Sequence, residues 1–220
     1  MRKSVKCLSA LALCGVGFAA GRITLSTPAA VLTPNASAAT VLSAMLVQPP
    51  EEMEAGMMKM MEAGTPGEHH KVLDTLIGEW TGFVRIRMDP SIEPDQMSTT
   101  ITREWILGGR YVKETVTSET ERGRFEGIGI VGYNNLEGLY EVGWIDSMST
   151  GIFTEQGYFE ATKKTFHFNG THRDPMGGGL ILTQSHLDIS NPDRHVMRGN
   201  MPGPDGTPYE HFYGVFERVK

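Results

Sequence analysis

The sequence contains little cysteine and fewer basic than acidic residues. Its 220 residues include only two cysteines, Cys7 and Cys14, which excludes a disulfide, a thiol nucleophile or a cysteine-ligated zinc site beyond residue 14. Lys and Arg number 20 against 26 Asp and Glu, for a formal net charge of −6. A general nucleic-acid binder presents a basic face to phosphates, so this balance argues against nucleic acid as a partner.

Long hydrophobic runs are also missing. The longest apolar stretch spans residues 7–20, directly after Arg2, Lys3 and Lys6, and is shorter than the ~20 residues of a membrane span. A basic segment followed by a short apolar stretch is typical of an export signal. We expect residues 1–38 to be a signal peptide or, if retained, an N-terminal anchor, and the rest of the protein to be periplasmic or secreted.

Residues 39–50 predict a linker, because small residues and proline dominate and no periodicity is present. Residues 51–77 predict two short helices, separated by a break at 64–67 and followed by the change of period at Gly78. One face of the first helix gathers methionines, namely Met53, Met57, Met60 and Met61. We expect this soft apolar face to lie on the domain, with a partner protein as the alternative occupant.

From Gly78 onward apolar residues alternate with a period of two, which predicts β-strands. About ten such runs follow one another, separated by turn residues: 79–88, 97–106, 110–118, 123–133, 138–146, 150–160, 164–171, 180–189, 194–201 and 208–219. Consecutive short strands favour an antiparallel meander, and closure removes the exposed edges of so large a sheet. The sequence therefore predicts an all-β fold, a single closed or nearly closed up-and-down β-barrel over residues 78–220.

The two ends of this region support the same architecture. Gly78-Glu79-Trp80 opens the first strand, and Arg218 lies near the end of the last one. A Gly-x-Trp motif with a late arginine resembles the lipocalin and calycin superfamily, in which the tryptophan closes one end of the barrel and packs under the arginine. This resemblance implies an architecture and leaves the ligand open.

A larger set of motifs resembles the bacterial domain-of-unknown-function family numbered 1579. The motifs span about residues 53 to 219 and comprise residues 57–80, 106–110, 125–129, 144–151, 174–176 and 203–206. The resemblance implies a lipocalin-like barrel. The family has no settled activity, so it implies no catalytic residues, and none is predicted.

The interior of a barrel of this size is wide enough for a small ligand. Aromatic walls with a few polar groups are typical of a site for a small, largely apolar molecule. The candidate binding residues are Trp80, Arg103, Trp105, Phe125, Tyr140, Trp144, Asp146 and Ser147. Asp146 and Ser147 can equally bond the backbone of their own turn, so a structural role stays open for both.

No cofactor is predicted, and haem is the alternative considered. Nitrobindin-type barrels, which are also calycin-like, bind haem through a histidine on a late strand. His211, with His195 behind it, is the candidate, and alternation predicts Tyr209 and Tyr213 on the same face. Two further alternatives are an enzyme and a structural or partner-binding envelope protein that uses the methionine face.

An enzyme would place one carboxylate in an apolar cup, with Asp146, Glu104 or Glu141 as the acid. Ser147 and His186 could complete a hydrolase triad with Asp146, but no Gly-x-Ser-x-Gly elbow seats them. The seven histidines show no zinc spacing, so no metal site is predicted.

A glycine run at 127–132 fits the letters of a dinucleotide loop. Such a loop needs a helix directly after it, because the phosphate is bound at the helix N-terminus. A turn and another strand pattern follow instead. We therefore interpret this run as a bent barrel strand.

Overall fold

The computed structural model describes residues 50–120, 123–173 and 178–220. The predicted signal peptide or anchor and nearly all of the predicted linker lie outside the described residues. Residues Glu51–Lys220 form one compact unit.

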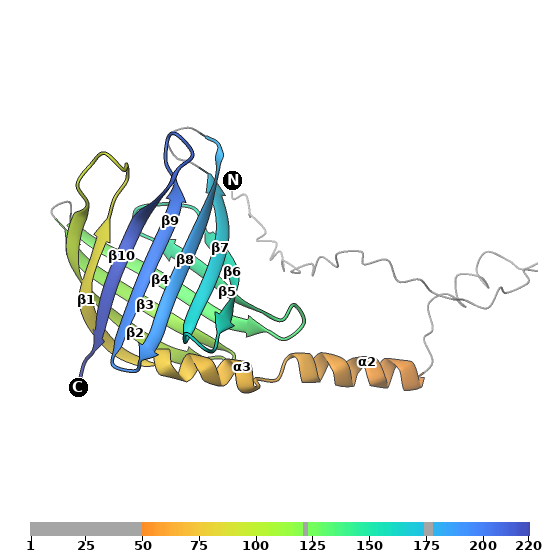
Figure 1. The fold of residues 1–220 in the computed structure, drawn as a ribbon. Coiled ribbons are helices and arrows are strands. Elements are labelled where there is room, and N and C mark those ends of the chain that lie inside the picture. Colours follow the sequence, from red (N-terminus) through yellow and green to blue (C-terminus); the bar gives the residue numbers. More distant parts are fainter. Residues whose placement is uncertain (1–49, 121–122, 174–177) are drawn as a thin grey trace, which may run out of the picture. The chain divides into compact units, whose positions relative to one another are not determined.

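Within the described residues, ten antiparallel strands close into one barrel (Figure 1). Each strand pairs with its neighbours in sequence, and β1 pairs with β10 to complete the ring. The strands are β1 (Gly78–Ile86), β2 (Asp95–Ile106), β3 (Tyr111–Thr120), β4 (Gly123–Asn134), β5 (Leu139–Asp146), β6 (Phe153–Glu160), β7 (Thr165–Arg173), β8 (Leu180–Asn191), β9 (Arg194–Pro202) and β10 (Pro208–Arg218). This topology confirms the predicted all-β, up-and-down barrel.

The strands follow the alternation of the sequence, and two glycines allow the sheet to curl. On β1, Trp80 is buried while the adjacent Thr81 is exposed, as a period of two requires. A Cβ atom at Gly82 would collide with the backbone carbonyl of Val215, and one at Gly157 with that of His167. The close approach of neighbouring strands at these two bends excludes a side chain and permits closure.

A short helical segment covers one end of the barrel, which we call the capped end (Figure 1). It consists of α3 (Glu68–Lys71) and the 3-10 turn η1 (Val72–Leu76), where the sequence pattern predicted one continuous helix. The helix narrows to a 3-10 turn there because the chain must enter β1 within two residues. Side chains of the barrel donate hydrogen bonds to the carbonyl groups at the end of this turn. Leu73 and Leu76 are buried in a hydrophobic cluster with Val112, Tyr140, Phe166, Phe168 and Ile189.

The helix α2 (Pro50–Ala63) exposes its methionine face. The four methionines of that face are between 55% and 69% exposed, so the expectation that it lies on the domain is wrong for the described residues. Glutamates surround the narrow apolar stripe, which leaves the helix polar enough to stand in water. Its end is held by Asn135, whose amide donates to the carbonyls of Ala63 and Thr65.

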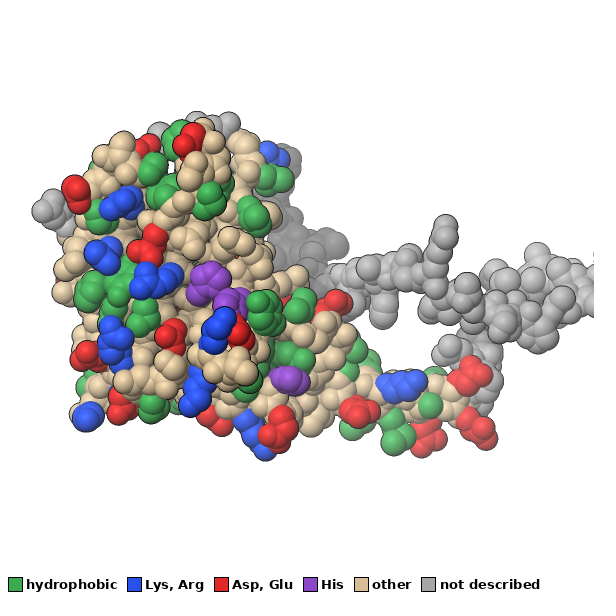
Figure 2. Space-filling model, viewed as in Figure 1, with side chains coloured by type: hydrophobic (Ala, Val, Ile, Leu, Met, Phe, Trp, Pro, Cys, Tyr) green, Lys and Arg blue, Asp and Glu red, His purple; other side chains and the backbone are tan. Residues whose placement is uncertain are grey.

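The barrel surface carries charges of both signs. Figure 2 shows acidic and basic side chains interspersed over the visible face, with histidine side chains gathered over β7 and β8. None of the helices in the described part of the chain has the length and hydropathy needed to cross a membrane.

Candidate ligand-binding site

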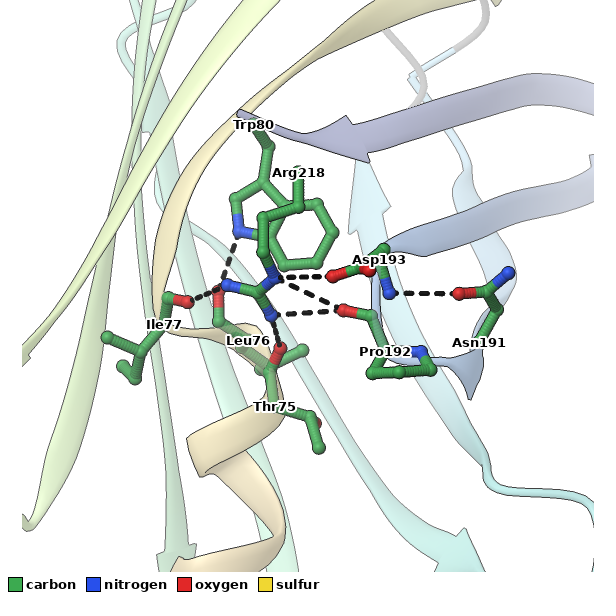
Figure 3. A network of polar contacts seen from close by, with 8 residues as sticks. All are labelled: Thr75, Leu76, Ile77, Trp80, Asn191, Pro192, Asp193 and Arg218. Atoms are coloured by element: carbon green, nitrogen blue, oxygen red, sulfur yellow. Dashed lines mark hydrogen bonds and ion pairs between the residues drawn. The ribbon is translucent and has the colours of Figure 1, made fainter. Parts of the chain in front are cut away.

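Trp80 and Arg218 form a floor at the capped end (Figure 3). The Trp80 side chain is fully buried, and its Nε1 donates to the carbonyl oxygen of Leu76 at 2.8 Å. The Arg218 guanidinium carbon lies 4.2 Å from the centroid of the Trp80 ring, within the range of a cation–π contact. The Gly-x-Trp motif and the late arginine predicted this pair.

Arg218 also joins three segments of the chain (Figure 3). Its guanidinium donates to the carbonyl oxygens of Thr75 at 2.9 Å and Ile77 at 2.5 Å. It donates as well to the carbonyl of Pro192 at 3.1 Å and pairs with the carboxylate of Asp193 at 3.3 Å. One side chain therefore caps the helical segment and ties it to the last strand and to the β8–β9 turn.

Two further predicted wall residues belong to this sealed end. Tyr140 is buried, and its hydroxyl donates to the carbonyl of His69 at 2.8 Å. Burial, with a smaller contribution from Tyr133, raises the pKa of Tyr140 to about 12. Trp105 donates from Nε1 to the carboxylate of Asp74 at 2.9 Å. Tyr140 and Trp105 therefore hold the cap on the barrel instead of facing the half of the interior away from the cap, which we call the open half.

Phe125 and Trp144 are predicted wall residues that the structure does bring together. Their rings stack with centroids 6.4 Å apart, and both side chains are half-buried. The Trp144 indole lies over Gly127 and Gly129, and a Cβ at Gly127 would overlap it. The glycines of this run thus make room for an aromatic side chain inside the barrel. They lie within β4, as the interpretation of a bent strand predicted.

Asp146 makes the turn bonds that the structural alternative described, whereas the Ser147 hydroxyl bonds the neighbouring strand β4. The Asp146 carboxylate accepts the backbone N–H groups of Met148 and Ser149 at 2.9 and 3.0 Å. It also accepts Trp144 Nε1 at 2.9 Å, so it orients the indole. Ser147 accepts the backbone N–H of Glu126 at 3.1 Å. Asp146 acts on the candidate site by positioning Trp144.

Arg103, the predicted polar anchor, lies deep in the barrel. Its side chain is 4% exposed, and its Nε pairs with the carboxylate of Glu114 at 2.5 Å. Its Nη1 has no hydrogen-bond partner among the described residues, and neither has either ring nitrogen of His195. His195 is fully buried, with its ring centroid 4.1 Å from that of Trp80. Burial, followed by the positive charges of Arg103 and Arg218, lowers the pKa of His195 to about 3.

Sequence reasoning missed Glu155, a carboxylate that points into the barrel. Strand alternation places it on the inward face of β6 with Phe153. Its oxygens accept the hydroxyl of Ser185 at 2.6 Å and that of Thr183 at 3.3 Å. A signal was available in the sequence: Glu155, like Glu114 on β3, interrupts the apolar side of an alternating strand.

We define the lumen site as the inward side chains of Glu114, Phe125, Trp144, Phe153, Glu155 and His172. All six are half-buried, so solvent reaches them although alternation directs them into the barrel. Phe153 and His172 meet edge to face, with centroids 5.5 Å apart. The lumen site thus combines aromatic surface with two carboxylates, a composition that suits a small ligand.

The cap and the lumen site both lie in a region that matches a known family. A family model described as protein of unknown function (DUF1579) matches residues 65–218. The chain belongs to the DUF1579 family. No curated protein matches it.

Two solved structures are similar to this DUF1579 chain. Rv2717c from M. tuberculosis has a TM-score of 0.52 and 15% sequence identity, over 71% of this chain and 100% of its own. An S-type phycobiliprotein lyase, CPES, from Guillardia theta has a TM-score of 0.48 and 9% identity, over 68% of this chain and 92% of its own. The first of these likenesses shows a common barrel architecture.

A β-bulge on β10 changes the surroundings expected for His211 in the DUF1579 barrel. Alternation predicted Tyr213 beside it, but Tyr213 lies on the outer face. There its ring is flanked by the guanidinium groups of Arg85 and Arg198, at 4.4 and 4.6 Å from the ring centroid. The prediction that His211 and Tyr213 share a face is wrong, because the extra residue of the bulge resets the alternation.

His211 itself lies on the interior side. Its Nε2 is 3.1 Å from the position that a Cβ would take at Gly199. Gly199 follows the inward positions of His195 and Met197 on β9. Burial, followed by the charge of His172, lowers the pKa of His211 to about 4, so its imidazole is neutral at pH 7.

The carboxylates named for an enzyme do not lie in an apolar cup. Glu104 is 60% exposed and pairs with Lys113 at 3.3 Å. Glu141 accepts the side-chain amides of Asn134 and Gln156 at 3.1 and 3.2 Å, on the outer face. The expectation that Glu104 or Glu141 serves as an interior acid is therefore wrong, since alternation turns both outward.

The structure does not bring together the hydrolase triad considered above, Ser147, His186 and Asp146. His186 lies on the outer face of β8, where its Nδ1 is 2.8 Å from Nδ1 of His167. Burial, followed by His167, lowers the pKa of His186. Asp146 and Ser147 bond the β5–β6 turn and the end of β4 instead. Within residues 50–120, 123–173 and 178–220, no group of three or more His, Cys, Asp and Glu side chains is placed to hold a metal ion.

Proposed function

We propose that the barrel binds a small, largely apolar molecule at the lumen site. The observation that carries the proposal is a difference in exposure among inward aromatic side chains. Trp80 and Tyr140 are sealed at the capped end, whereas Phe125, Trp144 and Phe153 keep part of their surface in solvent. Exposed aromatic surface inside a barrel is stabilised when an apolar ligand covers it.

The test uses Nile red, an uncharged apolar dye, with the full chain. We expect its emission to rise on binding, with one dye per barrel. Trp144→Ala is expected to weaken binding about tenfold, because it removes one face of the site. Trp105→Phe is the matched control, since this tryptophan contacts the cap. Absence of dye binding, or an equal loss in both variants, would contradict the proposal. Mass spectrometry of molecules that co-purify with the protein identifies the natural ligand.

Haem is the second candidate, and the position of His211 favours it. A neutral imidazole on the interior side is able to donate a nitrogen lone pair to iron. Haemin is titrated into the protein, and a Soret shift that disappears in His211→Ala is the expected result. His69→Ala, on the exposed face of α3, serves as the control. An unshifted Soret band, or one unchanged in His211→Ala, rejects haem.

We also propose that the protein acts in the bacterial envelope. Within residues 1–38, a basic segment is followed by a short apolar stretch, and this pattern supports the location. Cell fractionation with intact-mass measurement tests this location. A protein found in the envelope without the mass of residues 1–38 has had its signal peptide removed, and one found there with its full mass keeps the segment as an anchor. Recovery of the full-length protein in the cytoplasm overturns the proposal.

A further inference from the structure

The interior of the barrel has an unbalanced charge. Above the Trp80 floor, alternation directs one arginine, Arg103, and two glutamates, Glu114 and Glu155, into the barrel, and it places Asp95 and Asp146 on the inward face at the far ends of their strands. Arg103 and Glu114 pair at 2.5 Å and cancel one another. No second lysine or arginine occupies an inward position above the floor among the described residues. The remaining inward charge is therefore negative, and Glu155 is the carboxylate that lies between the strand ends.

Glu155 has polar partners but no cationic one. The hydroxyls of Ser185 and Thr183 donate to its two oxygens, at 2.6 and 3.3 Å. These bonds hold the carboxylate in place without neutralising it. It is half-buried, so a group that enters the lumen can reach it. A carboxylate fixed by neutral donors is a ready acceptor for a positively charged group.

The arginine is less accessible than the carboxylates around it. The Arg103 side chain is 4% exposed, whereas the side chain of its partner Glu114 is 24% exposed. A ligand in the lumen therefore meets the acidic member of this pair first. His211 adds no positive charge at neutral pH, because burial keeps its imidazole unprotonated.

Aromatic faces lie next to the unpaired carboxylate. Phe153 is two residues from Glu155 on the same inward face of β6, and its cross-strand partner on β5 is Trp144. Phe125 stacks on Trp144 from β4. Aromatic faces attract cations through their quadrupole, and Trp does so most strongly. Carboxylate and rings together favour a cation and disfavour an anion.

We propose that the lumen site selects apolar molecules that carry a protonated amine, with Glu155 as the partner of the amine. The inference rests on the proposed function and names the ligand class for the same site. A ligand of this class places its ammonium group at Glu155 and its apolar body against Trp144 and Phe153. Fatty-acid-like anions are excluded by the charge that Glu155 already supplies.

Three probes with the same ten-carbon chain test the proposal: 1-aminodecane, 1-decanol and decanoate, each displacing Nile red at pH 7. We expect the amine to bind about tenfold more tightly than the alcohol, as a charge-assisted hydrogen bond provides, and decanoate to bind most weakly. Glu155→Gln should lower the affinity for the amine to that for the alcohol, with the alcohol unchanged. Glu141→Gln, the same charge change on the outer face of the adjacent strand, should leave all three unchanged.

The outcomes separate the two proposals. If neither the dye nor any of the probes binds, the proposed function fails. If the alcohol binds as tightly as the amine, or decanoate binds best, interior binding stands and the amine selectivity is overturned. A loss of all three probes by the same factor in Glu155→Gln also overturns it, because Glu155 then only maintains the shape of the site.

Discussion

The capped end and the open half of the barrel use the same aromatic residue types in opposite ways. At the capped end, Trp80 and Tyr140 are buried, and their polar atoms donate to backbone carbonyls. In the open half, Phe125 and Trp144 stay partly exposed, and Glu155 bonds only neutral hydroxyls. The difference shows that the side chains of the cap stabilise the fold, while those of the lumen site keep surface exposed that a ligand could contact.

Replacing the two tryptophans is the strongest way to test this contrast. We expect Trp80→Ala to lower the free energy of unfolding by about 4 kcal/mol, because it opens a cavity in a sealed cluster. Trp144→Ala should cost about 1 kcal/mol, since the indole is already half-exposed. Urea denaturation measures both. Equal losses would show that the two ends are packed alike.

Arg218 tests the hydrogen bonds of the cap separately from its packing. Arg218→Met should cost about 3 kcal/mol, because it leaves the carbonyls of Thr75, Ile77 and Pro192 without their donor. Arg198→Met is the matched control. Like Arg218, Arg198 flanks an aromatic ring and pairs with a carboxylate, in this case that of a glutamate. Its side chain is 51% exposed, so we expect a cost of about 0.5 kcal/mol. A loss in the control as large as that of Arg218→Met contradicts the interpretation.

His195 lies at the boundary between the two regions and makes stability depend on pH. Its pKa in the folded state is about 3 against an ordinary 6.5, because burial and the charges of Arg103 and Arg218 outweigh the raising effect of Asp188. Below pH 6.5 the unfolded chain therefore takes up a proton that the folded chain does not. The free energy of unfolding therefore falls as the pH drops from 6.5 towards 3, by up to about 1.4 kcal/mol per pH unit.

His195→Phe should remove this contribution, because the ring no longer titrates. Between pH 7 and pH 5 the variant should lose about 2 kcal/mol less than the natural chain. Urea midpoints at the two pH values measure the difference. The same loss in both proteins would show that other groups carry the pH dependence.

The exposed helix α2 should give the smallest effect. The double substitution Met57→Glu and Met60→Glu alters two side chains that are 55% and 69% exposed, so stability should change by less than about 0.5 kcal/mol. In contrast, Leu73→Glu, on the buried side of the cap, should prevent folding. A large loss from the α2 substitutions, measured by urea denaturation, would mean that the helix supports the barrel.

Much of the fold follows from alternation along the chain, and the candidate site follows only in part. The period of two predicts which face of a strand each side chain takes, as for Trp80 and Thr81, and turn residues predict where the strands end. They do not give its height in the barrel. Tyr140 and Trp144 share one face of β5, yet Tyr140 belongs to the buried cluster of the cap, whereas Trp144 packs, only partly buried, against the cluster that contains Trp80. Height depends on the register between strands, which no single strand encodes.

Two other features escape sequence reasoning for separate reasons. The bulge at His211 adds one residue to β10 without any local composition signal, so the outward position of Tyr213 could not be anticipated. Glu155 was overlooked because it sits in a polar run, although its neighbours at alternate positions are apolar. A carboxylate on the apolar side of an alternating strand is therefore worth treating as a site residue from the outset.

The seam between β1 and β10 has a consequence for biosynthesis. Trp80 pairs with Arg218 across this seam. The first strand, β1, therefore lacks one of its two neighbouring strands until the last strand, β10, has been synthesised. A nascent chain that has emerged only as far as β9 presents two unpaired edges and an uncapped η1, whose carbonyls at Thr75 and Ile77 await the arginine. Ring closure, capping and burial of the tryptophan thus all await β10, and a chain that ends before Pro208 forfeits all three.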